Sequence, residues 1–173
     1  MKLCEIQRKR IDYYLNDEWL SDDPHISSSN FANLLAKVDS PLEIHAMVSE
    51  TDWDAGFEEL KQLVFHPQCD IATKLMVFWR CQPDYFCQFN SVDSIPKNDR
   101  GLWSFMNAIK EELTESKLKL ALINYSPFDD DGVNYVSEFE KNSSNNDSIV
   151  KVEHYLKKRV KAYNKLINKD IKS

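Results

Sequence analysis

The residues of this sequence that could bind a metal ion lie between positions 66 and 87. His66 and Cys69 are followed by Cys81 and Cys87, so four soft ligands fall within 22 residues. A structural zinc site needs a tetrahedral set, which commonly contains close pairs such as Cys-x-x-Cys. Cys69 and Cys81 would lie at opposite ends of an apolar helix, roughly 18 Å apart at ~1.5 Å per residue. We therefore expect buried, reduced thiols rather than a zinc site.

A second candidate metal site is the acidic segment 127–138. With Gly132 at the sixth position of a calcium-binding loop, Asp129 and Asp131 take positions three and five, and Glu138 takes position twelve. Pro127 stands where the first aspartate ligand belongs, so the loop lacks a primary ligand. We interpret the segment as an acidic turn and expect no bound metal. The carboxylates of this turn are Asp129, Asp130 and Asp131.

Catalytic motifs are missing from the sequence. Its 173 residues include three glycines, and no two are close enough to build a dinucleotide-binding loop, a P-loop or a nucleophile elbow. The four histidines are widely separated, and none belongs to a His-Glu-x-x-His pattern. Neighbouring carboxylates are common on the solvated surface of an acidic protein. We expect a protein that is not an enzyme and uses no cofactor.

The charge balance favours a basic protein partner. The chain has 28 acidic and 22 basic residues, a net charge of −6, whereas phosphate binding needs a basic face. We therefore expect no nucleic-acid partner. The first residues carry charge where a signal peptide would be apolar, and no apolar run reaches ~18 residues. The expected location is the cytoplasm, without membrane contact.

The negative charge is concentrated in the first part of the chain. Residues 151–173 hold eight Lys or Arg against two Asp or Glu, a net charge of +6 that leaves −12 for the preceding 150 residues. The terminal segment also repeats apolar residues at helical spacing. We expect it to pack on the acidic body, although a separate contact surface is the alternative.

Helical periodicity dominates the sequence and predicts an all-α fold. We expect a single compact domain of short antiparallel helices, solenoid-like in its first half. It comprises an acidic body (1–140), a polar loop (141–148) and a basic C-terminal helix (149–171). The helix that follows Asp70 is apolar on nearly all sides, which places it at the centre. Segment 118–125 stays open between a helix and a strand. The expected N-caps are residues 27–30, Ser40, Asp54, Asp70, and Asn98 or Asp99.

Two tryptophans beside carboxylates are candidate anchors for a partner protein. Trp19 follows Glu18, and Trp53 lies between Asp52 and Asp54. Exposed aromatic rings of this kind anchor interfaces, but for both tryptophans we favour packing in the core over contact with a partner. The candidate partner-binding residues are Trp19, Asp22, Asp23, Asp52, Trp53, Asp129, Asp130 and Asp131.

Segment 51–86 carries a long motif that resembles a known family. The matching residues are Trp53, Asp54, Gly56, Phe57, His66, Pro67, Cys69, Asp70, Ala72, Thr73, Leu75, Phe78, Trp79, Pro83, Asp84 and Tyr85. This pattern resembles the bacterial family called domain of unknown function 4274. The resemblance is close over about 36 residues and looser up to Asp131. The last 40 residues do not align with it.

The resemblance implies an immunity-type protein that binds a cognate bacterial toxin domain and blocks it. A helical interaction or adaptor module without a toxin partner is the alternative. The motif consists of caps and core residues, so it defines a fold rather than a binding site. Specificity for a toxin is therefore expected on other surfaces, such as the acidic loops or the C-terminal helix.

Overall fold

A computed structural model of the chain describes residues 2–53, 57–115, 122–123, 125–127, 130 and 132–142. These residues form eight α-helices and two 3-10 helices, and they contain no strand, which confirms the all-α prediction. The helices are α1 (Glu5–Leu15), α2 (Pro24–Leu35), α3 (Pro41–Glu50), α4 (Glu58–Val64), α5 (Ile71–Arg80), α6 (Pro83–Phe86), η2 (Val92–Ser94), η3 (Lys97–Asp99), α7 (Arg100–Glu115) and α8 (Tyr135–Asn142).

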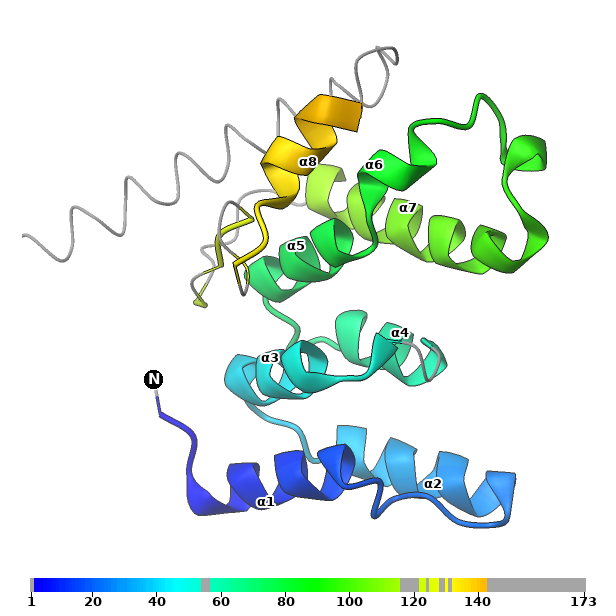
Figure 1. The fold of residues 1–173 in the computed structure, drawn as a ribbon. Coiled ribbons are helices and arrows are strands. Elements are labelled where there is room, and N and C mark those ends of the chain that lie inside the picture. Colours follow the sequence, from blue (N-terminus) through cyan, green and yellow to red (C-terminus); the bar gives the residue numbers. More distant parts are fainter. Residues whose placement is uncertain are drawn as a thin grey trace, which may run out of the picture.

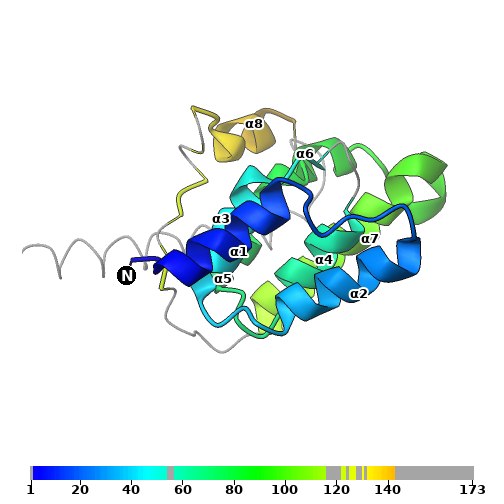
Figure 2. The same ribbon diagram turned by 90° about the horizontal axis from the view of Figure 1, so that it is seen from below.

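The helices stack in two layers. Helices α1, α3 and α5 lie side by side in one layer, and α2, α4 and α7 form the other (Figures 1 and 2). Side-chain pairs show that α1 and α3 run parallel, because Arg10 meets Glu43 near the start of α3 and Tyr14 meets Thr51 at its end. Helix α5 runs the same way, because His45 meets Thr73 and Ser49 meets Arg80. This arrangement is the solenoid-like stack expected for the first half of the chain.

Local capping explains where several helices begin. The hydroxyl of Ser40 accepts a hydrogen bond from the backbone N–H of Leu42, and Pro41 occupies the first turn of α3, as predicted. Asp70 caps α5 in the same way through the N–H of Ala72. The cap predicted for residues 27–30 is wrong, because α2 begins at Pro24, with Asp23 as its N-cap.

The Asp-Pro pair explains this earlier start. The carboxylate of Asp23 accepts a hydrogen bond from the N–H of His25 (2.8 Å), and Pro24 has the backbone angle of a first helical turn. Ser27 lies inside α2 and is buried. The predicted cap Asp54 lies outside the described residues. Asp99 belongs to η3, and its carboxylate accepts a hydrogen bond from the Tyr85 hydroxyl.

Helix α5 lies at the centre of the fold, as its apolar sequence predicts. It packs against α3, α4, α6 and α7. The Trp79 ring is 1% exposed and contacts Phe139 of α8 edge-on, with 5.9 Å between the ring centroids. The buried residues of α5 are Ala72, Thr73, Met76, Val77, Phe78 and Trp79.

Two long-range contacts hold the segment after α7 to this centre. The second carboxylate oxygen of Asp70 accepts a hydrogen bond from the N–H of Leu122 (2.8 Å), and Arg80 pairs with Asp130. Residues 141 and 142 end α8 rather than opening a loop. The rest of the predicted loop, the helix at 149–171 and most of segment 118–125 lie outside the described residues. No described helix combines the length and apolarity needed to cross a membrane.

Candidate functional site

Carboxylates lie at the C-terminal ends of α1 and α3, where basic side chains would stabilise the helices better. The hydroxyls of Tyr14 and Thr51 are 3.0 Å apart, which holds these two helix ends together. Neither helix has a basic residue in its last turn. A helix C-terminus carries partial negative charge, so added carboxylates strengthen the negative potential there. We define the acidic edge as the exposed residues Asp17, Glu18, Glu50 and Asp52.

The electrostatics of Tyr14 are consistent with this potential. Burial raises the pKa of its phenol, and the carboxylates of Glu59 and Asp17 raise that pKa further, against a lowering by the Thr51 hydrogen bond. Lys37 is the one Lys or Arg between Arg10 and Lys61 in the sequence. The acidic edge therefore has few cations nearby along the chain.

Trp19 lies in the core rather than on the surface. Its side chain is 7% exposed, and its ring lies 5.1 Å from that of Phe31 and 6.4 Å from that of Tyr14. The indole N–H donates a hydrogen bond to the Tyr14 carbonyl (3.3 Å). The structure therefore supports core packing, and Trp19 is not an exposed anchor. Asp22 and Asp23 beside it are exposed.

Trp53 is half-buried and lines a small pocket. Its indole nitrogen is buried without a hydrogen-bond acceptor. The pocket has a volume of about 290 Å³, and its other lining residues are Arg80, Asp130, Val133 and Tyr135. Asp52 next to it is exposed and belongs to the acidic edge. Of the two predicted anchors, Trp53 alone retains some exposed surface.

Asp130 is an internal ion-pair partner, which corrects its assignment to an exposed acidic surface. Its two carboxylate oxygens accept hydrogen bonds from Arg80 at 2.8 and 2.9 Å, and the Tyr125 hydroxyl adds a third at 3.3 Å. Asp130 also forms two backbone hydrogen bonds with Val133, which close a turn through Gly132 (φ +84°). Asp129 and Asp131 lie outside the described residues.

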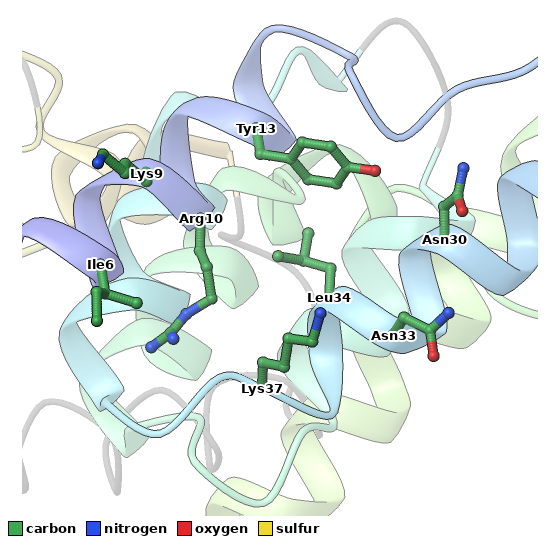
Figure 3. A pocket seen from close by; sticks show the side chains of 8 residues that line it. All are labelled: Ile6, Lys9, Arg10, Tyr13, Asn30, Asn33, Leu34 and Lys37. Carbon is green, nitrogen blue, oxygen red and sulfur yellow. The ribbon is translucent and has the colours of Figure 1, made fainter.

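A groove of about 430 Å³ separates α1 from α2 and was not anticipated (Figure 3). Leu34 and Tyr13 contribute apolar surface, while Lys9, Arg10 and Lys37 contribute positive charge. The lining residues are Ile6, Lys9, Arg10, Tyr13, Asn30, Asn33, Leu34 and Lys37. Helix α1 supplies residues at i, i+3, i+4 and i+7, and α2 supplies Asn30, Asn33 and Leu34 at i, i+3 and i+4, with Lys37 just beyond its end.

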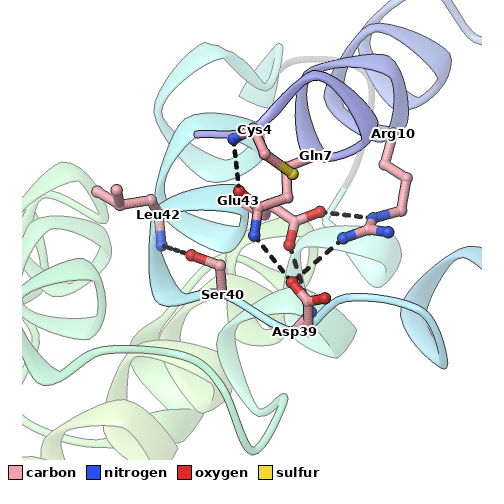
Figure 4. A network of polar contacts seen from close by, with 7 residues as sticks. All are labelled: Cys4, Gln7, Arg10, Asp39, Ser40, Leu42 and Glu43. Atoms are coloured by element: carbon pink, nitrogen blue, oxygen red, sulfur yellow. Dashed lines mark hydrogen bonds and ion pairs between the residues drawn. The ribbon is translucent and has the colours of Figure 1, made fainter. Parts of the chain in front are cut away.

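A polar network fixes one wall of the groove to α3 (Figure 4). The Arg10 guanidinium donates to Glu43, which is fully buried, at 2.6 Å and to Asp39 at 3.2 Å. Gln7 donates to Asp39 and accepts from the N–H of Cys4, both at 2.9 Å. The hydrogen bond to Glu43 raises the pKa of Arg10, and that from Gln7 lowers the pKa of Asp39. Arg10 is therefore a fixed positive charge.

The cysteines and His66 do not form a metal site. All four predicted ligands are described, and no three His, Cys, Asp or Glu residues in the described part of the chain are grouped to hold a metal ion. Burial raises the pKa of the Cys69 and Cys81 thiols to about 12, so both stay protonated. Cys87 is also buried and donates to the Pro83 carbonyl, whereas Cys4 is exposed.

The central helices of the chain match a known protein family. Residues 39–114 match the family described as domain of unknown function (DUF4274). The match begins before α3 and ends within α7. It extends beyond the close resemblance at 51–86 on both sides, but it stops before Asp131, where the looser resemblance ended. Comparisons with curated proteins and with solved structures find no match. The match over residues 39–114 therefore confirms the resemblance to the DUF4274 family.

Proposed function

We propose that the protein is an immunity-type inhibitor that binds a cognate bacterial toxin domain and neutralises it in the cytoplasm, without a catalytic role of its own. The observation that carries this proposal is the acidic edge. It presents four exposed carboxylates at the ends of two parallel helices. A surface of this kind suits a basic partner, since complementary charge speeds association and selects against wrong partners.

The position of the acidic edge fits a role in specificity. Asp17 and Glu18 precede the segment that matches the family, whereas Glu50 and Asp52 lie inside it. The edge thus combines a helix end inside the family match with a connection that lies outside it. Asp17, Glu18 and Glu50 form no ion pair within the described residues, so their charges are available to a partner.

The test is co-expression with the toxin domain encoded beside this gene, with growth as the readout. The wild-type protein should restore growth and form a complex on a sizing column. The variant Glu18→Lys/Glu50→Lys should lose rescue and weaken binding at least about tenfold, because like charges then face the partner. Asp93→Lys makes the same kind of change on an exposed side chain of η2 and should rescue as well as wild type.

Three results would overturn the proposal. Wild-type protein that neither rescues growth nor binds the toxin domain excludes toxin inhibition. Rescue that survives the double substitution excludes the acidic edge as the contact. A pull-down that returns a housekeeping protein instead of a toxin would support the helical adaptor.

A further inference from the structure

Two exposed leucines lie beside the acidic edge. Leu15 ends α1 and is 37% exposed, and Leu20 lies in the connection to α2 and is 52% exposed. Asp17 and Glu18 fall between these leucines in the chain, and both are exposed. Exposed apolar side chains bordered by carboxylates are the surface that a basic amphipathic helix binds best.

The carboxylates of the acidic edge differ from those on other helices in having no cation of their own. Asp17, Glu18 and Glu50 form no ion pair within the described residues. By contrast, Glu58 of α4 pairs with a lysine of the same helix, and Glu112 of α7 pairs with a lysine of α5. A basic segment therefore meets more uncompensated negative charge at the acidic edge than at these paired positions.

The chain contains a segment of complementary character at residues 149–171, which we call the terminal segment. Its apolar residues recur at spacings of three or four and are Ile149, Val152, Leu156, Val160, Tyr163 and Ile167. In helical projection, Lys157 and Arg159 flank this apolar side. Lys165 and Lys169 fall on the opposite side. The sequence of the terminal segment thus offers apolar side chains with cations on both sides of them.

The chain is long enough to bring the terminal segment to the acidic edge. Tyr135, at the start of α8, lines the same pocket as Trp53, the residue that follows Asp52 of the acidic edge. Helix α8 is about 12 Å long, and the six residues 143–148 can span roughly 20 Å. The terminal segment can therefore turn back over the length of α8 and reach the acidic edge.

We propose that the terminal segment binds the acidic edge of its own chain, with its apolar side on the two exposed leucines and its flanking cations near Glu18 and Glu50. Residues 151–173 carry a net charge of +6 and the preceding 150 residues carry −12, so the contact is favourable and sensitive to salt. The free protein then covers the surface that a basic partner would use. That a toxin must displace the segment rests on the proposed function, whereas the intramolecular contact does not.

The test is hydrogen exchange of the full chain, followed by mass spectrometry at several protein concentrations. At ~0.02 M salt the amides of the terminal segment should exchange slowly in wild type, and ~0.5 M salt should speed their exchange. The edge variant, Glu18→Lys/Glu50→Lys, should speed this exchange at least about tenfold, because like charges then face each other. Asp93→Lys reverses an exposed charge on η2 and should leave the exchange of the segment unchanged.

Substitutions in the terminal segment provide the matching arm. Lys157→Glu/Arg159→Glu reverses the cations beside the apolar side and should speed exchange as the edge variant does. Lys165→Glu/Lys169→Glu makes the same change in total charge on the opposite side and should speed exchange far less. Combining the first of these with the edge variant in one chain should restore the slow exchange of wild type, because the facing charges are complementary again.

Rapid exchange of the terminal segment in wild type at low salt would overturn the proposal. Slow exchange that the edge variant leaves unchanged would also overturn it, as would a combined variant that exchanges as fast as its two parents. Slow exchange that is lost on dilution would overturn it by assigning the contact to a second copy. No toxin is present in these measurements, so their failure leaves the proposed inhibition untouched, and failure of growth rescue leaves the intramolecular contact untouched.

Discussion

Glu43 of α3 is fully buried, and it forms an ion pair with one residue of another helix, Arg10 of α1. The guanidinium of Arg10 lies 2.6 Å from it and is itself 16% exposed. Removing one partner of such a pair leaves an uncompensated charge, which is far more costly than the pair is stabilising. The ion pair between α1 and α3 therefore depends on a single arginine.

We expect Arg10→Met to lower the free energy of unfolding by about 3–5 kcal/mol, because Glu43 then stays buried without a cation. Urea unfolding at pH 7 measures this change. Adding Glu43→Gln should recover much of the loss, since a neutral amide is cheaper to bury. Lys9→Met, at the neighbouring exposed position, should change stability by no more than ~0.5 kcal/mol. Equal losses for Arg10 and Lys9 would contradict this reading.

His45 makes stability depend on pH in the mildly acidic range. Burial lowers its pKa below 6.5, and its Nδ1 lies 3.0 Å from the Thr73 hydroxyl. The unfolded chain therefore takes up a proton first as pH falls, so stability is full above pH 6.5 and declines below it. Urea unfolding at pH 7.5 and 5.5 should show this decline in wild type. The decline should shrink in His45→Asn and persist in His25→Asn.

Residue-level prediction succeeded where the cause is local. The caps Ser40 and Asp70 were predictable because a capping oxygen accepts a hydrogen bond from a backbone N–H only two or three residues further along the chain. Asp130 was misplaced because its partner, Arg80, lies 50 residues away in the sequence. The carboxylates around Trp19 suggested a surface, whereas its ring packs on Phe31 in another helix.

At the scale of elements, Asp70 performs two tasks with two oxygens. One caps α5 through the N–H of Ala72, and the other accepts a hydrogen bond from the N–H of Leu122, beyond the end of α7. We expect Asp70→Ala to cost about 2–3 kcal/mol, because a cap is worth about 1 kcal/mol and the Leu122 N–H also loses its acceptor.

Substitution by serine separates these two contributions. Asp70→Ser keeps a capping oxygen and should cost about half as much as Asp70→Ala in thermal or urea unfolding. Ser40→Ala removes a cap alone and should cost about 1 kcal/mol. Equal losses for the serine and alanine variants of Asp70 would show that the cap contributes nothing. A serine variant as stable as wild type would show that the contact with Leu122 contributes nothing.

The long helices were predictable because apolar residues recur along them at helical spacing. The period of Phe31, Leu34 and Val38 identified α2, but its start was missed because an Asp-Pro pair placed it a turn earlier. The short elements α6, η2 and η3 escaped prediction because three or four residues contain no full helical period.

For the whole molecule, the order of the stack sets which part opens first. Within the described residues, helix α5 is surrounded by other helices, whereas the first hairpin is held on one side only. We expect amide hydrogens of α1 and α2 to exchange faster than those of α5, through partial opening of the end hairpin. Hydrogen exchange followed by mass spectrometry measures this difference.

The same measurement on Arg10→Met gives a second result. Exchange should accelerate in α1 and α2 while α5 keeps its protection, because the lost contact lies between α1 and α3. Acceleration of all helices to the same degree would instead mean that the stack opens as one unit.

The stacking of the helices was predictable from the sequence, but the groove between α1 and α2 was not. Short connections between amphipathic helices imply neighbouring packing, which the stack confirms. The groove could not be foreseen, because its existence depends on how far α1 and α2 stand apart rather than on which faces they turn to each other.

The sequential stacking of α1 to α5 also bears on how quickly the chain folds. Each helix meets partners that follow it closely along the chain, so little entropy is lost in closing loops before contacts form. Two exceptions are the links from Asp70 to Leu122 and from Arg80 to Asp130, which span 52 and 50 residues. The stacked helices can therefore assemble early and fast, and these two links can close only once α5 offers its Asp70 and Arg80 ends.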